Sequence, residues 1–157
     1  MNAIRIAALA ALALPASCAG GVAPGPSPIA AQRGLRIAPE QAVMNAAAVA
    51  PAGVSAIFEM QVRNSGRQDG ILYLNSEADY RDPRCLTIAI AAPIADALHQ
   101  RFGTAVDQHL SGKTIAVRGT ARRIRIHFYS SGKMTDKYYY QTQVNLKAAR
   151  HLTVSGE

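Results

Sequence analysis

The sequence predicts one mostly β domain, a small barrel of five strands with a helix between the third and fourth strands. Two observations lead to this fold class. Segments of alternating apolar and polar residues recur between positions 54 and 147, and one segment with helical spacing, 93–102, interrupts them. About 120 residues follow position 35, enough for a single hydrophobic core.

The domain is predicted to begin with a short helix and a half-buried strand. In residues 39–46, Pro39 suits the first turn of a helix, Glu40 follows it, and good helix formers come next. Residues 54–63 alternate as a strand with one solvent face should. Its apolar residues share the other face: Ala56, Phe58, Met60 and Val62.

Turn residues and apolar runs define the middle of the domain. We predict a turn at 64–70, a strand at 71–74, a polar loop at 75–84 and a strand at 85–91. The core residues of that third strand are expected to be Leu86, Ile88 and Ile90. A helix over 93–102 follows, because Ile94, Ala97, Leu98 and Phe102 recur at helical spacing before Gly103.

The last two strands are predicted to form a long hairpin. In residues 113–129 the apolar positions are odd-numbered as far as Ala121 and even-numbered from Ile124 onward. A one-residue slip turns every side chain over, so this change predicts a β-bulge near Arg122 and Arg123. A turn at 130–133 leads into the last strand, 137–147, whose apolar side holds Tyr138, Tyr140, Thr142, Val144 and Leu146.

Three strands, a helix and two further strands are the plan of the OB fold, a partly open Greek-key barrel. Another small β barrel or an α+β sheet remains as an alternative.

Three runs resemble exported bacterial OB-fold domains of the tRNA-anticodon-binding-like kind: residues 58–63, 73–83 and 112–119. The resemblance spans residues 38–155, and its most specific part is the GKTIAVRG run at 112–119. It implies an OB barrel, with nucleic-acid binding implied only by analogy, because a fold does not fix a function.

The N-terminus has the pattern of an export signal. Arg5 precedes a short apolar run, 6–14, and small residues follow at 15–20, so we predict a signal peptide over 1–19. The alternative is a buried N-terminal helix. Residues 20–34, rich in Ala, Gly and Pro, are predicted to be a flexible linker before a domain at 35–157. The protein is therefore expected to be periplasmic or secreted.

The chain has two cysteines, Cys18 and Cys85. Cys18 is a candidate lipidation site, although Pro15 departs from the lipoprotein pattern, and ordinary cleavage after Ala16 or Ala19 competes with lipidation. Either process leaves Cys85 without a partner, so we expect no disulfide and a buried, unreactive thiol.

Charge is concentrated in one stretch of the chain. Residues 113–137 hold seven basic residues and one acid, and thus carry +6 of the formal net charge of +7. Such a field attracts anions. On the predicted hairpin we expect Arg123, Arg125, His127 and Tyr129 to share a face, with cations meeting phosphates and rings stacking on bases. The predicted ligand-binding residues are Arg118, Arg123, Arg125, His127, Tyr129, Lys133, Lys137 and Tyr139. The alternative is a solvated wall that keeps the strands from aggregating.

Other chemistry has weaker support in the sequence. Acids in the 76–84 loop could hold a cation, but the arginines among them are expected to pair with the carboxylates. No pair of histidines has zinc-site spacing, and we predict no metal, no cofactor and no catalytic set. The acids and arginines leave a metal-dependent nuclease as a third hypothesis.

We therefore predict an exported OB-fold protein that binds an anionic polymer, either single-stranded nucleic acid or an acidic glycan. The alternative from the same sequence is an envelope protein that docks on a protein partner or on the cell wall.

Overall fold

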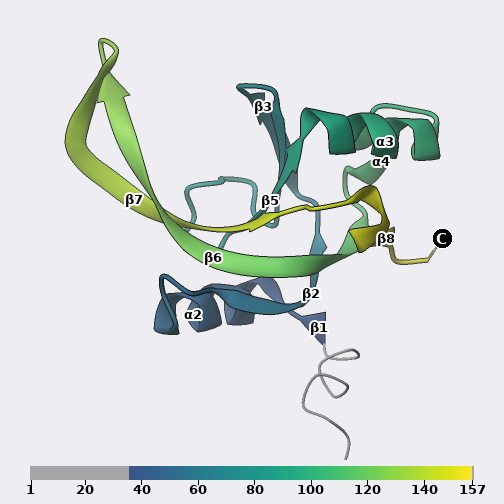
Figure 1. Cartoon of the computed structure of the whole chain (residues 1–157), viewed down its shortest axis with the longest axis horizontal. Helices are drawn as coiled ribbons and strands as arrows, with labels where there is room; N and C mark the ends of the chain where they lie inside the picture. Colours follow the sequence, from purple (N-terminus) through teal and green to yellow (C-terminus); the bar gives the residue numbers. More distant parts are fainter. Residues whose placement is uncertain (1–35, 157) are drawn as a thin grey trace, which may run out of the picture.

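The computed structural model describes residues 36–156 (Figure 1). The predicted signal peptide, the linker and Cys18 lie outside the described residues. Helices flank a strongly curved sheet, with α2 on one side and α3 with α4 on the other (Figure 1). Among the described residues, no helix has the length and apolar character needed to cross a membrane.

The predicted elements occur in the predicted order, with further elements at both ends and between them. The strands are β1 (Arg36–Ile37), β2 (Val54–Gln61), β3 (Asn64–Gln68), β4 (Ile71–Asn75), β5 (Leu86–Ala91), β6 (Thr114–Ser130), β7 (Lys133–Asn145) and β8 (Leu152–Val154). The helices are α2 (Pro39–Ala48), α3 (Ala92–Phe102), α4 (Val106–Leu110) and the 3-10 turn η1 (Ala149–His151). The sequence did not predict β1, β3, α4, η1 or β8.

The strands form a barrel of the OB type. Their order is β1-β2-β6-β7-β5-β4-β3, with β8 paired to β6. Strands β2 and β3, which follow each other in the sequence, therefore lie near opposite ends of this order. Between β2 and β3, Val62 hydrogen-bonds with Lys113 and Gly112 on one side, and the next residue, Arg63, donates to the Asn75 carbonyl on the other. The segment from β2 to β3 thus serves as one bent first strand. The β5–β7 pair is parallel, as the Greek-key order requires.

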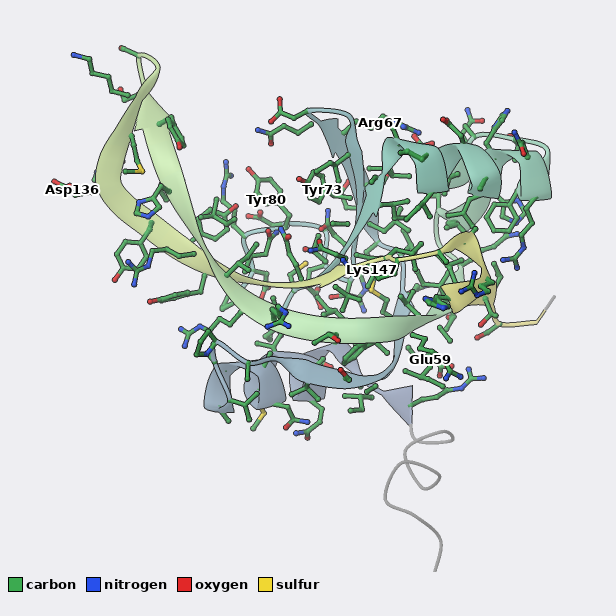
Figure 2. All side chains as sticks on the ribbon, in the orientation of Figure 1. Glu59, Arg67, Tyr73, Tyr80, Asp136 and Lys147 are labelled. Atoms are coloured by element: carbon green, nitrogen blue, oxygen red, sulfur yellow. The ribbon has the colours of Figure 1, made fainter. Side chains whose placement is uncertain are left out.

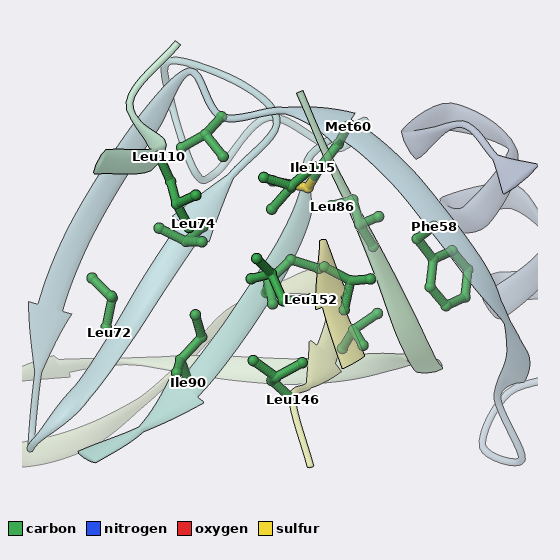
Figure 3. Close-up of a cluster of buried hydrophobic side chains, with 14 of the residues drawn as sticks. Phe58, Met60, Leu72, Leu74, Leu86, Ile90, Leu110, Ile115, Leu146 and Leu152 are labelled. Atoms are coloured by element: carbon green, nitrogen blue, oxygen red, sulfur yellow. The ribbon is translucent and has the colours of Figure 1, made fainter. Parts of the chain in front are cut away.

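The core fills the inside of this barrel (Figure 3). The predicted inward residues of β5, Leu86, Ile88 and Ile90, are fully buried, and so are Phe58 and Ile115. From α2, the two small residues Ala42 and Ala46 are fully buried, so this helix lies directly against β2 and β6. From α3, Leu98 and Ala95 pack into the same core.

Three sequence predictions about local structure are wrong. The predicted turn at 130–133 is shorter, because Ser130 pairs with Lys133 and β7 begins at Lys133 instead of at 137. Residues 64–68, predicted as part of a turn, form strand β3, which pairs residue by residue with β4. The turn is confined to Asp69 and Gly70, both of which have positive φ angles, 51° and 76°. Such angles at both central residues define a tight hairpin turn whose twist matches its strands.

The predicted bulge at Arg122 and Arg123 is absent, since the β6–β7 register is continuous from Ala121 to His127. The register shifts nearer the tip, where three residues of β7, 135–137, stand opposite the single residue Phe128. The Thr135 hydroxyl donates to the Phe128 carbonyl oxygen at 2.9 Å and fixes this bulge.

Gly119 of β6 provides a test of this packing. A Cβ atom at this position would lie 2.5 Å from Cγ1 of Val144, a fully buried side chain. We expect Gly119→Ala to destabilise the fold by about 1–3 kcal/mol, because the core has no room for the added methyl group. Denaturant unfolding would measure this decrease in stability.

Gly66→Ala in β3 is the matched control, because nothing lies within 4 Å of a Cβ atom there. Its stability should equal or slightly exceed that of the parent chain. Equal unfolding midpoints for the two variants would contradict the packing described for Val144.

Candidate functional site

The predicted basic hairpin projects from the barrel as a two-stranded ribbon (Figure 1). The pairing of β6 with β2 ends at Ala121, and β5 pairs with β7 only over Thr142–Asn145. Within the described chain, the outer parts of β6 and β7 therefore pair only with each other. Ser131 and Gly132 form the turn, with φ angles of 50° and 76°.

One face of the ribbon holds arginine and tyrosine side chains in alternation. Arg125 lies opposite Tyr140 and Arg123 opposite Thr142, so both arginines share a face with the even-numbered residues of β7. The Arg123 guanidinium carbon lies 3.8 Å from the ring centre of Tyr140, and that of Arg125 lies 4.7 Å from the ring centre of Tyr138. We call Arg123, Arg125, Tyr138 and Tyr140 the Arg–Tyr ladder.

Contact with the tyrosine rings restrains the guanidinium groups of the ladder, and this contact itself uses none of their N–H donors. A guanidinium on a ring uses its flat face, and its N–H groups point outward in the plane. One donor of Arg125 reaches the Tyr140 hydroxyl at 3.3 Å. This hydrogen bond and the charge of Arg125 lower the pKa of Tyr140, and the same hydrogen bond raises the pKa of Arg125. All four ladder side chains are exposed.

The predicted site residues separate into several groups. Tyr139 does not share the face of Arg123 and Arg125; it lies opposite Ile126 on the other face of the ribbon. His127 is half-buried beside Tyr138, and its Nδ1 atom is buried without a hydrogen-bond partner. Of the predicted site residues, Tyr129, Lys133 and Lys137 lie near the tip of the ribbon and are exposed. Arg118 lies apart from the ribbon, on the barrel wall.

The second face of the ribbon borders a cleft of about 280 Å³ between the two hairpins of the fold. Tyr139 and Ile126 line it from the ribbon, while Tyr73 of β4 and Tyr80 of the following loop line it from the other side. Figure 2 shows Tyr73 and Tyr80 in the space between the β6–β7 ribbon and β3. Tyr139 lies 6.5 Å from Tyr80 between ring centres, and its burial raises its pKa.

A buried polar network holds the cleft's floor in place. The Gln141 amide donates to the Thr87 hydroxyl oxygen at 3.1 Å and to the Tyr80 carbonyl at 3.3 Å. The Thr87 hydroxyl in turn donates to the Asn75 side-chain carbonyl at 2.9 Å. Thr87 and Asn75 are buried, so their polar groups need these hydrogen bonds. Through Gln141, the same network connects the Tyr80 loop to the barrel wall.

The acids of that loop are held by local partners. Asp82 accepts two hydrogen bonds from the Arg84 guanidinium, at 2.9 and 3.1 Å, which hold its pKa at about 2. For Asp82 this confirms the expected pairing with an arginine of the same loop. Glu77 pairs instead with Arg63. In residues 36–156 no three His, Cys, Asp or Glu side chains gather as a metal site would require. Cys85 is buried, as predicted.

The positive charge of the ribbon is not neutralised locally. The four ion pairs among the described residues are Arg36–Glu59, Arg63–Glu77, Arg67–Asp107 and Arg84–Asp82. None of them involves the ladder arginines, Lys133 or Lys137. The exposed large apolar side chains also concentrate here, with Phe128, Tyr129, Met134, Tyr138 and Tyr140 on the ribbon. Cations and rings therefore reach solvent together.

No protein-family model and no curated protein sequence matches this chain. Among solved structures, an aspartyl-tRNA synthetase from Entamoeba histolytica is 8% identical, covers 66% of this chain and has a TM-score of 0.40. A putative aspartyl-tRNA synthetase from Leishmania major Friedlin is 10% identical, covers 76% and has the same TM-score. The chain spans only 19% and 20% of those proteins. The fold assignment accordingly rests on the strand pairing, and these two similarities do not bear on function.

The contrasting environments of Tyr140 and Tyr139 predict distinct titrations. A phenolate beside a guanidinium is stabilised and one in a desolvated cleft is not, so Tyr140 should ionise below the ordinary pKa near 10 and Tyr139 above it. NMR of tyrosine ring signals between neutral and alkaline pH would follow both residues, with Tyr→Phe variants for assignment.

Arg125→Ala should raise the pKa of Tyr140 and leave that of Tyr139 unchanged, whereas Arg36→Ala should alter neither. An unchanged Tyr140 titration in Arg125→Ala would contradict the ladder geometry.

Proposed function

We propose that this chain is an exported OB-fold binding protein whose β6–β7 ribbon binds a single-stranded anionic polymer, with single-stranded nucleic acid as the best fit. The fold itself follows from the strand pairing. Export rests on the N-terminal sequence, residues 1–19. The observation that supports the ligand class is the Arg–Tyr ladder, in which exposed rings and unneutralised guanidinium groups alternate on one face.

The ladder provides both interactions that a single strand requires. Phosphates accept paired hydrogen bonds from the outward N–H edge of a guanidinium, in the planar geometry that arginine favours. Bases stack on tyrosine rings whatever their sequence, which contributes about 1–3 kcal/mol per base. A double helix would not offer its bases to the rings, so the arrangement favours single strands.

The cleft on the other face of the ribbon adds further rings. Tyr73, Tyr80 and Tyr139 line it, and Tyr139 also lies 5.4 Å from Phe128 between ring centres. In OB folds this outer surface, between the hairpins, is the usual place for oligonucleotides and oligosaccharides. A strand that passes over the ribbon could therefore meet rings on both faces.

Arg123→Ala with Arg125→Ala tests this proposal. We expect the double variant to bind an oligothymidylate more weakly and with a smaller dependence on salt. The slope of log K against log salt concentration should fall by about 0.7 for each phosphate that the variant no longer neutralises. Fluorescence anisotropy of a labelled oligonucleotide at several salt concentrations would measure both quantities.

Arg36→Ala with Arg63→Ala is the control, because it removes the same two positive charges as the test variant. Both arginines lie outside the ribbon, in exposed ion pairs. It should preserve most of the affinity and the slope. Equal decreases in affinity in the two double variants would show a generic charge effect and overturn the assignment of the ribbon. Stronger binding of an acidic glycan than of the oligonucleotide would keep the polymer site but change its ligand.

A second candidate function, docking on an envelope protein, is favoured by the apolar side chains at the ribbon's tip. Tyr129 is 69% exposed and Met134 is 62% exposed, and neither is needed to bind a phosphate. Recovery of one defined protein partner in high salt, abolished in Tyr129→Ser with Met134→Ser, would support docking over polymer binding.

A further inference from the structure

A second hollow, lined by basic side chains, lies on the barrel wall. It is a groove of about 560 Å³ over the outer surfaces of β2, β6 and β7, with η1 at one side. Gln143 lines both this groove and the aromatic cleft, so the two hollows adjoin. Lys147, which follows β7, lies near the middle of the molecule, far from Asp136 on the ribbon (Figure 2).

Basic side chains from several elements line this groove: Arg118 and Arg122 of β6, Lys147, and His151 of η1. No aspartate or glutamate among the described residues lines it. Arg122 is held in place, because it donates to the carbonyl oxygens of Pro51 and Ala52 at 3.0 and 2.6 Å. Its charge remains in the groove, while one of its terminal nitrogens is directed to the backbone.

The other basic groups keep their side-chain donors free. In the described part of the chain, no side-chain hydrogen bond or ion pair involves Arg118, Lys147 or His151. Neutral polar groups surround them, including Asn145 and the Ser55 and Thr120 hydroxyls, which bond to each other at 2.7 Å. The groove thus presents the side-chain donors of Arg118, Lys147 and His151 without a carboxylate to accept from them.

This arrangement differs from an ordinary solvated surface. Like charges that gather in one hollow repel one another, and here no carboxylate offsets the repulsion. Arginine and lysine line a shared concave space instead of spreading over a convex one. Of the described residues, no aromatic ring other than His151 lines the groove, so recognition there would depend on charge and hydrogen bonds and would not use base stacking.

We infer that this groove, lined by Arg118, Lys147 and His151, binds phosphate groups. Phosphate matches the planar donors of arginine and the point charge of lysine. Two sources could supply the group: the backbone of a polymer already bound on the ribbon, or a small phosphorylated molecule. The first source rests on the proposed function, and the second does not.

Arg118→Ala with Lys147→Ala, made in the full chain, is the test variant. The probes are inorganic pyrophosphate, titrated by NMR, and an oligothymidylate, titrated at several salt concentrations. Arg36→Ala with Arg63→Ala is the control for charge, and thermal unfolding of every variant confirms that it is folded. Because Arg118 and Lys147 are exposed, we expect the test variant to fold normally.

If the ligand is a small phosphorylated molecule, addition of pyrophosphate should shift the His151 ring signals. The test variant should then bind pyrophosphate at least about tenfold more weakly, because two charge-assisted hydrogen bonds are removed. If the ligand is a polymer backbone, pyrophosphate should bind weakly. The slope of log K against log salt concentration for the oligonucleotide should then fall by about 0.7 for each phosphate contact that is lost, in the test variant and not in the control.

If pyrophosphate and oligonucleotide binding are both unchanged in the test variant, the groove is not a phosphate site. The proposed function is judged separately, by Arg123→Ala with Arg125→Ala. If binding is weaker in Arg118→Ala with Lys147→Ala but unchanged in Arg123→Ala with Arg125→Ala, the groove is a phosphate site and the ladder is not the polymer site.

Discussion

The separation of this structure into a barrel and a projecting ribbon depends on one point in β6, residue Ala121. Ala121 pairs with Val54 of β2 on one side and with Val144 of β7 on the other, and it is fully buried. It is the last residue at which β6 has two neighbouring strands. Before it, odd-numbered residues face the core; beyond it the strand leaves the barrel, and the same face carries Arg123 and Arg125 into solvent. The change from apolar to cationic residues on one face needs no bulge, only the end of the barrel.

The bend between β2 and β3 is the second constraint, because it places two hairpins side by side. Val62 bonds toward the β6 side and Arg63 toward β4, so one continuous segment closes the barrel. The β3–β4 hairpin then stands beside the β6–β7 ribbon, and Tyr73 lines the same cleft as Tyr139. Neither hairpin alone would form this cleft. Its rings come from residues far apart in the sequence, held by the hydrogen bonds of the buried polar network.

The sequence predicted what local periodicity encodes: strands β2, β4, β5, β6 and β7, the α3 helix between β5 and β6, and the buried face of β5. It missed what pairing decides. Residues 64–68 are polar and contain a glycine, so their strand exists only because β4 pairs with them. The ladder could have been predicted from the sequence. A two-residue turn at Ser131 and Gly132 places odd-numbered residues of β6 opposite even-numbered residues of β7. The bulge at Thr135 shifts the register by two residues and so preserves this pairing. The cleft and the groove could not be predicted from the sequence, because each is lined by several elements that only the tertiary structure brings together.

The choice of residue types on the ribbon separates a binding surface from a merely soluble one. A two-stranded ribbon has two open edges, and charge on it discourages pairing with other chains. Lysine would suffice for that purpose, and Lys133 and Lys137 at the tip fit it. The ladder instead uses arginines packed on tyrosine rings at 3.8 and 4.7 Å, which limits their freedom and orients their donors. Protection of an edge gains nothing from fixed donors, whereas recognition of a phosphate does, because the side chains have less entropy to give up when the ligand binds. The geometry of the ladder therefore supports the proposed binding role more than a role in solubility alone.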